Sequence, residues 1–307
     1  MTTIDNDREK WVADFFRSYF SYTNDKNAAE AARKLKNSNI PKKLYRYRNM
    51  CIPSEKKEPY ALEEVRERYL HMSKPCELND PFDSAASCNL LSNDVLYTAY
   101  KSLSDAIHKV KGIDSSTVKN TFNAMARFID NNNKSIGHSL QDEASPIRLC
   151  SLTETNTNMP MWWSYAKERS GLCIEYDTTN IPDGSESMLI QSLFPVRYVK
   201  KMPDISSLIN GINQPEMYLL WQQVILTKSY DWRYEREWRL LDIFGLSFDP
   251  LTSSAWSNSY KISAVYMGDL MADDFKEELK LICRLRDIDL FQLRIGLQEC
   301  EFDPVAC

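Results

Sequence analysis

Long apolar runs are missing from this chain of 307 residues, and so are targeting signals. No stretch reaches the length of about 18 apolar residues that a membrane-spanning helix needs. The opening residues, MTTIDNDREK, have neither the basic start nor the apolar segment of a signal peptide. We therefore expect a cytoplasmic protein without a membrane partner.

Metal-binding and redox patterns are also sparse. The eight cysteines include no Cys-x-x-Cys pair, which argues against a zinc ribbon or a redox dithiol. The three histidines, His71, His108 and His138, are far apart and show no ligand spacing along a helix face. This spacing argues against a histidine-based metal site and against a Ser-His-Asp triad. No metal cofactor is expected.

An excess of positive charge is absent as well. The formal net charge of −5 argues against a general nucleic-acid-binding surface, although a local basic cleft remains compatible with it. Hydrophobic residues make up 43% and charged residues 26%, which are ordinary values for a globular protein. The chain has no internal repeat and is long enough for one large domain or two small ones.

Helical and strand-like patterns mingle without strict βαβ alternation, which favours an α+β fold. Helices are expected at residues 5–38, 92–135, 161–166, 216–228 and 273–284. Strands are expected at residues 44–48, 69–73, 147–152, 172–177, 194–199, 232–244, 262–268 and 289–295. The predicted organisation is an N-terminal helical segment at 1–40 and a single α+β domain at 41–307, with a helical insertion around 92–135.

The densest group of charged and aromatic side chains is WRYEREWR at residues 232–239. A strand with a period of two places on one face Arg233, Glu235, Glu237 and Arg239. The other face then holds Trp232, Tyr234 and Trp238. Two interpretations fit this pattern: a salt-bridged outer strand, or an active-site strand that carries two glutamates.

A second charged strand is expected at residues 44–48, where Arg46 and Arg48 share one face. Two guanidinium groups on an inner strand would be costly to bury without an anion. The strand is then either an exposed edge or a clamp for a diphosphate. Further along, Asn79-Asp80-Pro81 is typical of a turn in which Asx side chains bond the nearby backbone.

Several separated segments resemble, in the same order, the bacterial family called domain of unknown function 2971. They are LYRYR at 44–48, MSKP at 72–75, LNDPFD at 78–83, CSL at 150–152, MWWSYA at 161–166, GLCIEY at 171–176 and WRYEREWR at 232–239. The resemblance covers roughly residues 42–300, and the family name supplies no function.

A second resemblance is to the ADP-ribosyltransferase fold, in which an early strand carries Arg or His, a middle strand ends in Ser, and a later strand carries a catalytic Glu, often in a Glu-x-Glu pair. The counterparts in this chain are Arg46, Ser73 and Glu235-Arg236-Glu237. The resemblance implies a mixed, mainly antiparallel split sheet with N-terminal and inserted helices. The chain departs from the pattern after Ser73, where Lys74-Pro75 replaces the usual small hydroxyl residues.

This resemblance also implies NAD as the substrate and a role for each candidate residue. Glu237 would stabilise the oxocarbenium-like state in which nicotinamide leaves the ribose, and Glu235 would position the acceptor or take its proton. The residues implied in binding NAD are Arg46 and Arg48 at the pyrophosphate, Ser73, Asn79 and Asp80, and Trp232 or Tyr234 stacked on nicotinamide. The acceptor, a protein or a nucleic acid, stays unspecified, and a role in bacterial antiphage defence or as a toxin follows by analogy alone.

Two other functions fit the same residues. A metal-dependent nuclease would use as Mg²⁺ ligands Asp80, Asp83, Glu235 and Glu237. A non-enzymatic binding module would instead use these carboxylates and Arg46 as a structural polar network. Whether Arg46, Ser73 and Glu237 line one cleft separates the enzyme from the other interpretations.

Overall fold

The fold is described from a computed structural model of the chain. It describes residues 3–20, 26–80, 82–86, 147–179, 186–204, 219, 222–242, 248–249, 254–255, 260–296 and 301–307. The helical insertion expected around 92–135 lies outside these residues, as does part of the first half of the helix expected at 216–228.

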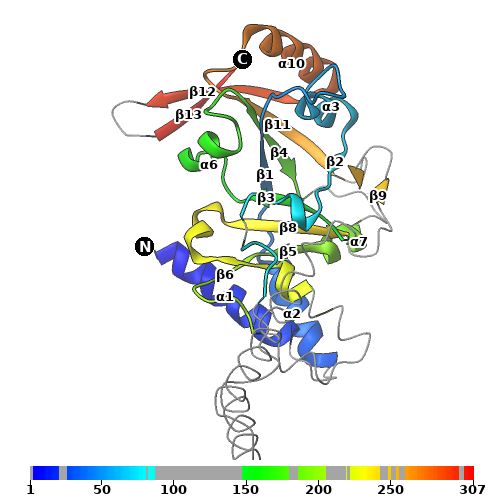
Figure 1. Cartoon of the computed structure of the whole chain (residues 1–307), viewed down its shortest axis with the longest axis vertical. Coiled ribbons are helices and arrows are strands. Elements are labelled where there is room, and N and C mark those ends of the chain that lie inside the picture. Colours follow the sequence, from blue (N-terminus) through cyan, green and yellow to red (C-terminus); the bar gives the residue numbers. More distant parts are fainter. Residues whose placement is uncertain are drawn as a thin grey trace, which may run out of the picture.

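Eight strands form the main sheet, in the order β13-β12-β11-β4-β1-β3-β8-β5 (Figure 1). Their bounds are β1 Lys43–Arg48, β3 Arg148–Thr153, β4 Leu172–Asp177, β5 Leu193–Pro195, β8 Glu237–Asp242, β11 Lys261–Met267, β12 Asp289–Gly296 and β13 Glu301–Ala306. All neighbouring strands are antiparallel except β11 and β12, which are parallel. The expectation of an α+β fold with a large, mainly antiparallel sheet is confirmed.

The main sheet is weakly joined in its middle. Strand β1 pairs with β4 along its whole length, from Lys43 to Arg48. It pairs with β3 at a single position, Tyr45 opposite Thr153. The sheet therefore divides into a part from β13 to β1 and a part from β3 to β5, and the two parts diverge between β1 and β3.

Two smaller sheets flank the main one. The first consists of β2 Leu70–His71, β10 Ser254–Ala255 and β9 Phe248–Asp249, all antiparallel. The second pairs β6 Arg197–Val199 in parallel with β7 Thr227–Ser229.

Helices pack at both ends of the molecule (Figure 1). The α-helices are α1 Thr3–Tyr19, α2 Lys26–Ser38, α3 Tyr60–Glu67, α6 Met159–Ser164, α7 Glu186–Ser192 and α10 Asp273–Arg286; the 3₁₀ helices are η1 Pro75–Glu77 and η3 Tyr230–Glu235. Helices α1 and α2 lie beside the β5 end of the sheet, while α3 and α10 lie at the opposite end. There α3 and α10 are tied together by an ion pair of 2.7 Å between Arg66 and Glu278.

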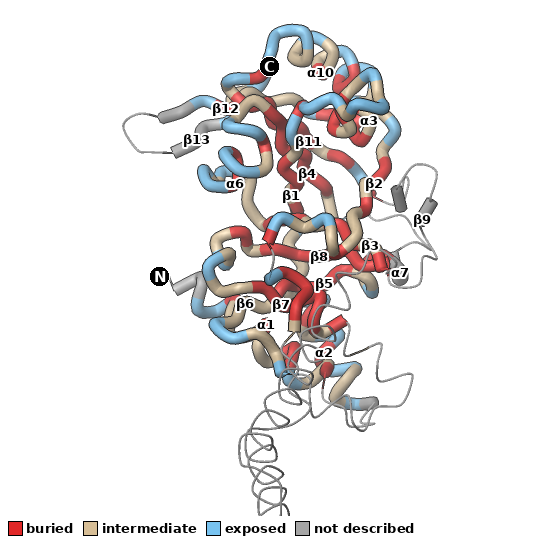
Figure 2. The backbone as a smooth tube through the Cα atoms, in the orientation of Figure 1, coloured by how far each residue is buried: buried red, intermediate tan, exposed pale blue. Residues whose placement is uncertain are grey.

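Buried residues concentrate along the strands of the main sheet (Figure 2). All six residues of β8 are buried, and so are the first five of β4. Helix α1 contributes to the core on the β5 side, where Val12, Phe15 and Phe16 cluster with Phe194. The apolar spacing of this helix, which predicts helix at 5–38, thus reflects a core-facing stripe.

The expectation of one strand over residues 232–244 is wrong in its first half. Residues Tyr230–Glu235 form η3, which closes where the N–H of Arg236 donates to the carbonyl of Arg233 at 3.2 Å. Arg236 is left-handed, with φ of 47°, and β8 starts only at Glu237. Within this turn the ring centroids of Trp232 and Tyr234 lie 6.0 Å apart.

Other parts of the chain also differ from the expectation. The helix predicted to run to residue 228 gives way to strand β7 at Thr227. The strand predicted at 194–199 divides at Val196, because its N–H donates to Glu237 while the next N–H, of Arg197, donates to Leu226. Strand β13 was not expected at all. Among the described strands it pairs with β12 alone, and it contains Pro304, which suits an edge strand that needs fewer backbone donors.

Candidate functional site

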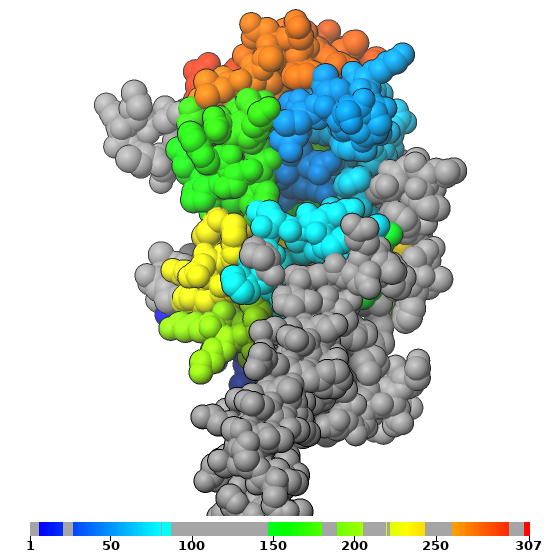
Figure 3. Space-filling view, viewed as in Figure 1, coloured from blue at the N-terminus to red at the C-terminus, as the bar shows by residue number. Residues whose placement is uncertain are grey.

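A cavity of about 270 Å³ opens where β1 and β3 diverge. The space-filling view shows the surface hollowed where the green segment around α6, the blue segment of β1 and the cyan segment after β2 meet (Figure 3). The polar and aromatic residues that line the cavity are Tyr45, Arg46, Tyr47, Arg48, Ser73, Glu77, Asn79, Asp83, Ser151, Thr153, Tyr165, Lys228, Glu235, Glu237 and Arg239. Its volume lies near the lower end of the range of about 300–1,000 Å³ for small-molecule sites.

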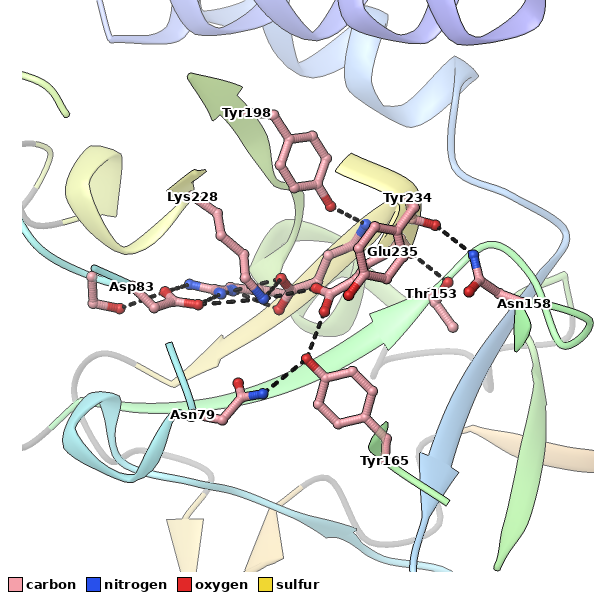
Figure 4. Close-up of polar contacts among 12 residues, drawn as sticks. Asn79, Asp83, Thr153, Asn158, Tyr165, Tyr198, Lys228, Tyr234 and Glu235 are labelled. Atoms are coloured by element: carbon pink, nitrogen blue, oxygen red, sulfur yellow. Dashed lines mark hydrogen bonds and ion pairs between the residues drawn. The ribbon is translucent and has the colours of Figure 1, made fainter. Parts of the chain in front are cut away.

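Lys228, at the centre of β7, meets three carboxylates on one wall of the cavity (Figure 4). Its Nζ lies 2.7 Å from Glu235, 3.3 Å from Glu237 and 3.6 Å from Asp83. All four side chains are almost completely buried. Burial disfavours the ammonium, but the surrounding carboxylates outweigh it and raise the pKa of Lys228.

Arg239 is the second cation of this wall and is fully buried. Its Nη1 and Nη2 donate to the two oxygens of Asp83 at 2.8 and 2.6 Å, which is the bidentate geometry that guanidinium groups favour. Its Nε donates to Glu237 at 2.8 Å. Asp83, Glu235 and Glu237 thus face two cations, which leaves one negative charge in excess when all three are ionised.

The two glutamates of the Glu-x-Glu pair differ in acidity. Burial raises the pKa of Glu235, and the neighbouring Glu237 carboxylate raises it further. Burial also opposes ionisation of Glu237, but Arg239 and Lys228 outweigh it and lower the pKa of Glu237 to about 2. At neutral pH Glu237 is therefore a fixed anion, while Glu235 is the carboxyl group closer to proton exchange.

Tyr165 holds Glu235 from the opposite side of the cavity (Figure 4). Its hydroxyl donates to Oε1 of Glu235 at 2.5 Å and accepts from the amide of Asn79 at 3.3 Å. The hydroxyl of Thr153 donates to the backbone carbonyl of Glu235, so the residue is also fixed through its main chain. Burial and the Glu235 charge raise the pKa of Tyr165, which keeps the hydroxyl a donor.

The two arginines of β1 lie on the other wall, next to a single carboxylate. Arg46 pairs with Glu64 of α3 at 2.6 Å, and Arg48 pairs with the same carboxylate at 3.0 Å. Glu64 is fully buried. Of the two expectations for this strand, the exposed edge is wrong, because β1 lies between β4 and β3. Glu64 supplies the anion that buried guanidinium groups need, yet one positive charge remains in excess.

The structure brings together six of the nine predicted site residues in one cavity: Arg46, Arg48, Ser73, Asn79, Glu235 and Glu237. Ser73 is held there by a backbone bridge to Leu149 of β3. The other three lie outside the cavity lining. Asp80 is buried and caps its own turn by accepting from the N–H of Phe82 at 2.9 Å.

The two aromatic residues predicted to stack on nicotinamide also lie outside the cavity lining. The ring of Trp232 packs against the ammonium of Lys228, with 5.0 Å between Nζ and the ring centroid. Tyr234 lines a neighbouring pocket. The cause is the turn at Arg236, which carries these two rings away from the face on which Glu237 lies. Aromatic rings in the cavity come instead from Tyr45, Tyr47 and Tyr165.

Several residues of the site were not among the predicted ones. Lys228 and Tyr165 lie in segments that read as a helix end and as an aromatic helix, and their charges and hydroxyls gave no signal. Glu64 lies on α3, one of several acidic residues there. Arg239 follows Glu237 by two residues and so lies on the same face of the strand. Among these residues, it alone could have been predicted at the site from its spacing in the sequence.

The geometry does not favour the carboxylate arrangement of a nuclease. Within the described ranges, no group of three or more His, Cys, Asp or Glu side chains is placed to hold a metal ion. Lys228 and Arg239 stand between Asp83, Glu235 and Glu237, where a nuclease would bind its cation. Asp80, the remaining candidate ligand, is used by its own turn.

Comparisons with known proteins agree with the first resemblance. Residues 161–240 match the family model described as "Protein of unknown function (DUF2971)". This stretch runs from α6 to the middle of β8 and contains Tyr165, Lys228, Glu235, Glu237 and Arg239. The resemblance predicted from the separated segments is therefore confirmed over these residues. No curated protein and no solved structure matches the chain. Among the described residues, no helix combines the length and the apolar character needed to cross a membrane.

Proposed function

We propose that this chain is an ADP-ribosyltransferase-like enzyme, which cleaves the bond between nicotinamide and ribose in NAD and transfers ADP-ribose to a macromolecular acceptor. The observation that carries the proposal is that Arg46, Ser73 and Glu237, which are far apart in the sequence, line one cavity. The divergence of β1 from β3 supports a split sheet of the same class.

The charges along the cavity suit the charges of NAD. The β1 wall has two guanidinium groups against Glu64, and this surplus of positive charge suits the pyrophosphate. The β8 wall has three carboxylates against two cations, and this surplus of negative charge suits the cationic nicotinamide ring and the charge that develops on the ribose. Tyr45 takes the stacking place, because Trp232 and Tyr234 lie outside the cavity.

The different acidities of the two glutamates support a division of labour. The C–N bond breaks with its electron pair going to nicotinamide, and positive charge develops on the ribose. Glu237, ionised at neutral pH, stabilises that charge. The acceptor then bonds to the ribose carbon, and its proton passes to Glu235, whose raised pKa suits a general base.

The test is release of nicotinamide from NAD by the full-length chain, measured by chromatography with protein, nucleic acid or water as the acceptor. We expect release by the natural chain and none by Glu237→Gln. The matched control is Glu175→Gln, since Glu175 is equally buried and ion-paired, through Lys43, but does not line the cavity. Release that persists in Glu237→Gln, or that is absent from the natural chain with every acceptor, contradicts the proposal.

A non-enzymatic binding module is the second candidate, and one observation favours it. Both carboxylate oxygens of Glu237 already accept from Arg239, at 2.8 and 3.2 Å, as in a structural ion-pair network. In that case Glu237→Gln and Glu175→Gln should both lower the melting temperature, and no variant should differ in nicotinamide release. The same two experiments therefore separate the candidates.

A further inference from the structure

A second pocket, of about 630 Å³, lies beside the segment that carries the two glutamates. Arg233, Tyr234 and Arg236 line it, whereas Glu235 and Glu237 line the first cavity. The N-terminal helix closes one side with Arg8. The volume is within the range of about 300–1,000 Å³ that small-molecule sites occupy.

Positive charge is in slight excess in this pocket. It is lined by three arginines, Arg8, Arg233 and Arg236, and by two glutamates, Glu9 and Glu154. Glu154 is shared, because it accepts from Arg8 at 2.7 Å, from Arg236 at 2.8 Å and from the indole of Trp238 at 2.9 Å. Glu154 thus joins Arg8 and Arg236 within the lining of the pocket.

Arg233 adds a charge that no carboxylate balances in the described part of the chain. Its guanidinium lies 4.5 Å from the centroid of the Tyr230 ring and donates to the carbonyl of Tyr230 at 3.3 Å. Arg233 is exposed, so its guanidinium can contact a ligand without breaking a buried ion pair. A guanidinium held over an aromatic ring keeps its remaining donors for an anion.

Aromatic rings complete the lining. Tyr234 is anchored through its backbone carbonyl, which accepts from the amide of Asn158 at 3.0 Å, and its half-buried side chain lines the pocket. Tyr198 lines the pocket next to Arg8, with 5.7 Å between the guanidinium carbon and the ring centroid. Aromatic side chains of this kind are the platforms on which bases stack in nucleotide sites.

We propose that this second pocket binds a nucleotide, with its phosphate between Arg233 and Arg236 and its base against Tyr234. Guanidinium groups recognise phosphate through paired hydrogen bonds, and the pocket is much larger than a lone phosphate requires. The proposal is independent of the NAD reaction, because Arg233, Tyr234 and Arg236 do not line the first cavity.

The experiment is calorimetric titration of the full-length chain with AMP and, separately, with inorganic phosphate at low salt. AMP should bind, and Arg233→Gln should weaken its binding about tenfold, as expected for the loss of one charge-assisted contact. Tyr234→Ala should weaken AMP binding but not phosphate binding, and Tyr234→Phe should restore it. The control, Arg284→Gln, removes an exposed arginine of α10 at the far end of the molecule and should change nothing.

Three results would overturn the proposal: no binding of AMP, equal weakening by Arg284→Gln and Arg233→Gln, or loss of binding in Arg48→Gln with full binding in Arg233→Gln. The last result would place AMP in the first cavity. Hydrogen exchange gives a second measurement, in which AMP must slow the exchange of residues 232–236 in the natural chain, and must slow it less in Arg233→Gln at the same AMP concentration.

Discussion

At the scale of single residues, the site depends on charges that are buried together. Lys228 and Arg239 are enclosed with Asp83, Glu235 and Glu237, and every one of these five side chains is less than 5% exposed. The free energy needed to remove buried charges from water can exceed the attraction gained in a single ion pair. Such a network therefore adds little net stability, but it fixes the relative positions of its side chains. Removal of any one member leaves the others uncompensated.

Lys228→Met tests this view. The substitution keeps the length of the side chain but leaves three carboxylates with Arg239 alone, so the free energy of unfolding should fall by about 3–5 kcal/mol. Urea denaturation measures the change. The control, Lys280→Met, removes a lysine from an exposed pair with Glu277 and should stay within about 0.5 kcal/mol. Equal stability of the two variants would show that the buried network is not coupled to folding.

The lowered pKa of Glu237 predicts how the free energy of unfolding depends on pH. The pKa of Glu237 is lowered in the folded chain to about 2 from an unfolded value near 4.5. Between these values the unfolded chain binds the additional proton, so this carboxylate stabilises the fold above pH 4.5 and loses that effect as the pH falls toward 2.

The measurement is the free energy of unfolding of the natural chain and of Glu237→Gln from pH 7 down to pH 2. The natural chain should be the more stable at neutral pH, and the difference should shrink as the pH falls through this window. A difference that stays constant with pH would contradict the lowered pKa. The pKa of Glu235 is raised, so its effect on the free energy of unfolding changes with pH in the opposite direction. Glu235→Gln should therefore not reproduce the pH profile of Glu237→Gln.

At the scale of elements, the loop from α6 to β4 places Tyr165 opposite Glu235. Three consecutive residues of this loop, Lys167, Glu168 and Arg169, are left-handed, with φ of 45°, 53° and 66°. Such backbone costs energy for residues that carry a Cβ, so surrounding contacts must hold it. The backbone of Gly268 provides them, since its N–H donates to Gly171 and its Cα lies against the Arg169 carbonyl.

Gly268→Ala should therefore weaken this loop. An added Cβ would lie 1.8 Å from the carbonyl oxygen of Arg169, and backbone cannot move aside as a side chain can. We expect a loss of about 1–3 kcal/mol in the free energy of unfolding, which is typical of overpacking. We also expect NAD to bind more weakly in the cavity next to Tyr165. Thermal denaturation and hydrogen exchange of residues 165–171 check both, and an unchanged loop would contradict the role given to Gly268.

The elements that the sequence predicted correctly are those whose side-chain pattern and packing agree. The apolar residues at the start of residues 172–177 predict a buried strand. In the structure β4 is a central strand, paired along its two edges with β1 and β11. Residues 232–236 were wrongly predicted as strand because alternation of charged and aromatic residues is equally compatible with a 3₁₀ turn. In the structure Trp232 packs against Lys228 of β7, a contact that no local sequence pattern reports.

The same reasoning applies to the site. Arg46, Ser73, Glu235 and Glu237 were predicted together because the resemblance to the ADP-ribosyltransferase fold orders them along the chain, and the structure brings them to one cavity. Lys228 and Glu64 were not, since a buried charge is recognised by its partners and these come from other elements. The pairing of Arg46 and Arg48 with one glutamate follows from the position of α3, which the sequence of β1 does not contain.

At the scale of the whole molecule, the N-terminal helices belong to the core. Val12, Phe15 and Phe16 of α1 are at most 2% exposed and pack in the cluster that also holds Leu149 of β3. Arg8 reaches further, to the backbone carbonyl of Glu237 at 2.9 Å. Burial of each large apolar side chain contributes about 1.5–3 kcal/mol, so α1 accounts for a substantial share of the few kcal/mol that stabilise a domain.

Removal of residues 1–40 should consequently prevent stable folding of residues 41–307. The shortened chain would expose the apolar cluster around Leu149 and Phe194, and we expect a loss of cooperative thermal unfolding together with binding of a hydrophobic dye. Val12→Ala in the full-length chain is a graded control that should cost less than the deletion. A shortened chain with an unchanged melting transition would make the N-terminal segment a separate unit.

The order of strands in the sheet also determines when β1 can pair during synthesis of the chain. Strand β1 ends at residue 48, but its full-length partner β4 ends at residue 177, roughly 130 residues later. At about 5–20 residues per second, the ribosome takes on the order of 10 s to supply that partner. During this interval Leu44 and Tyr47 have no sheet to join, and their two unpaired strand edges are open to other nascent chains.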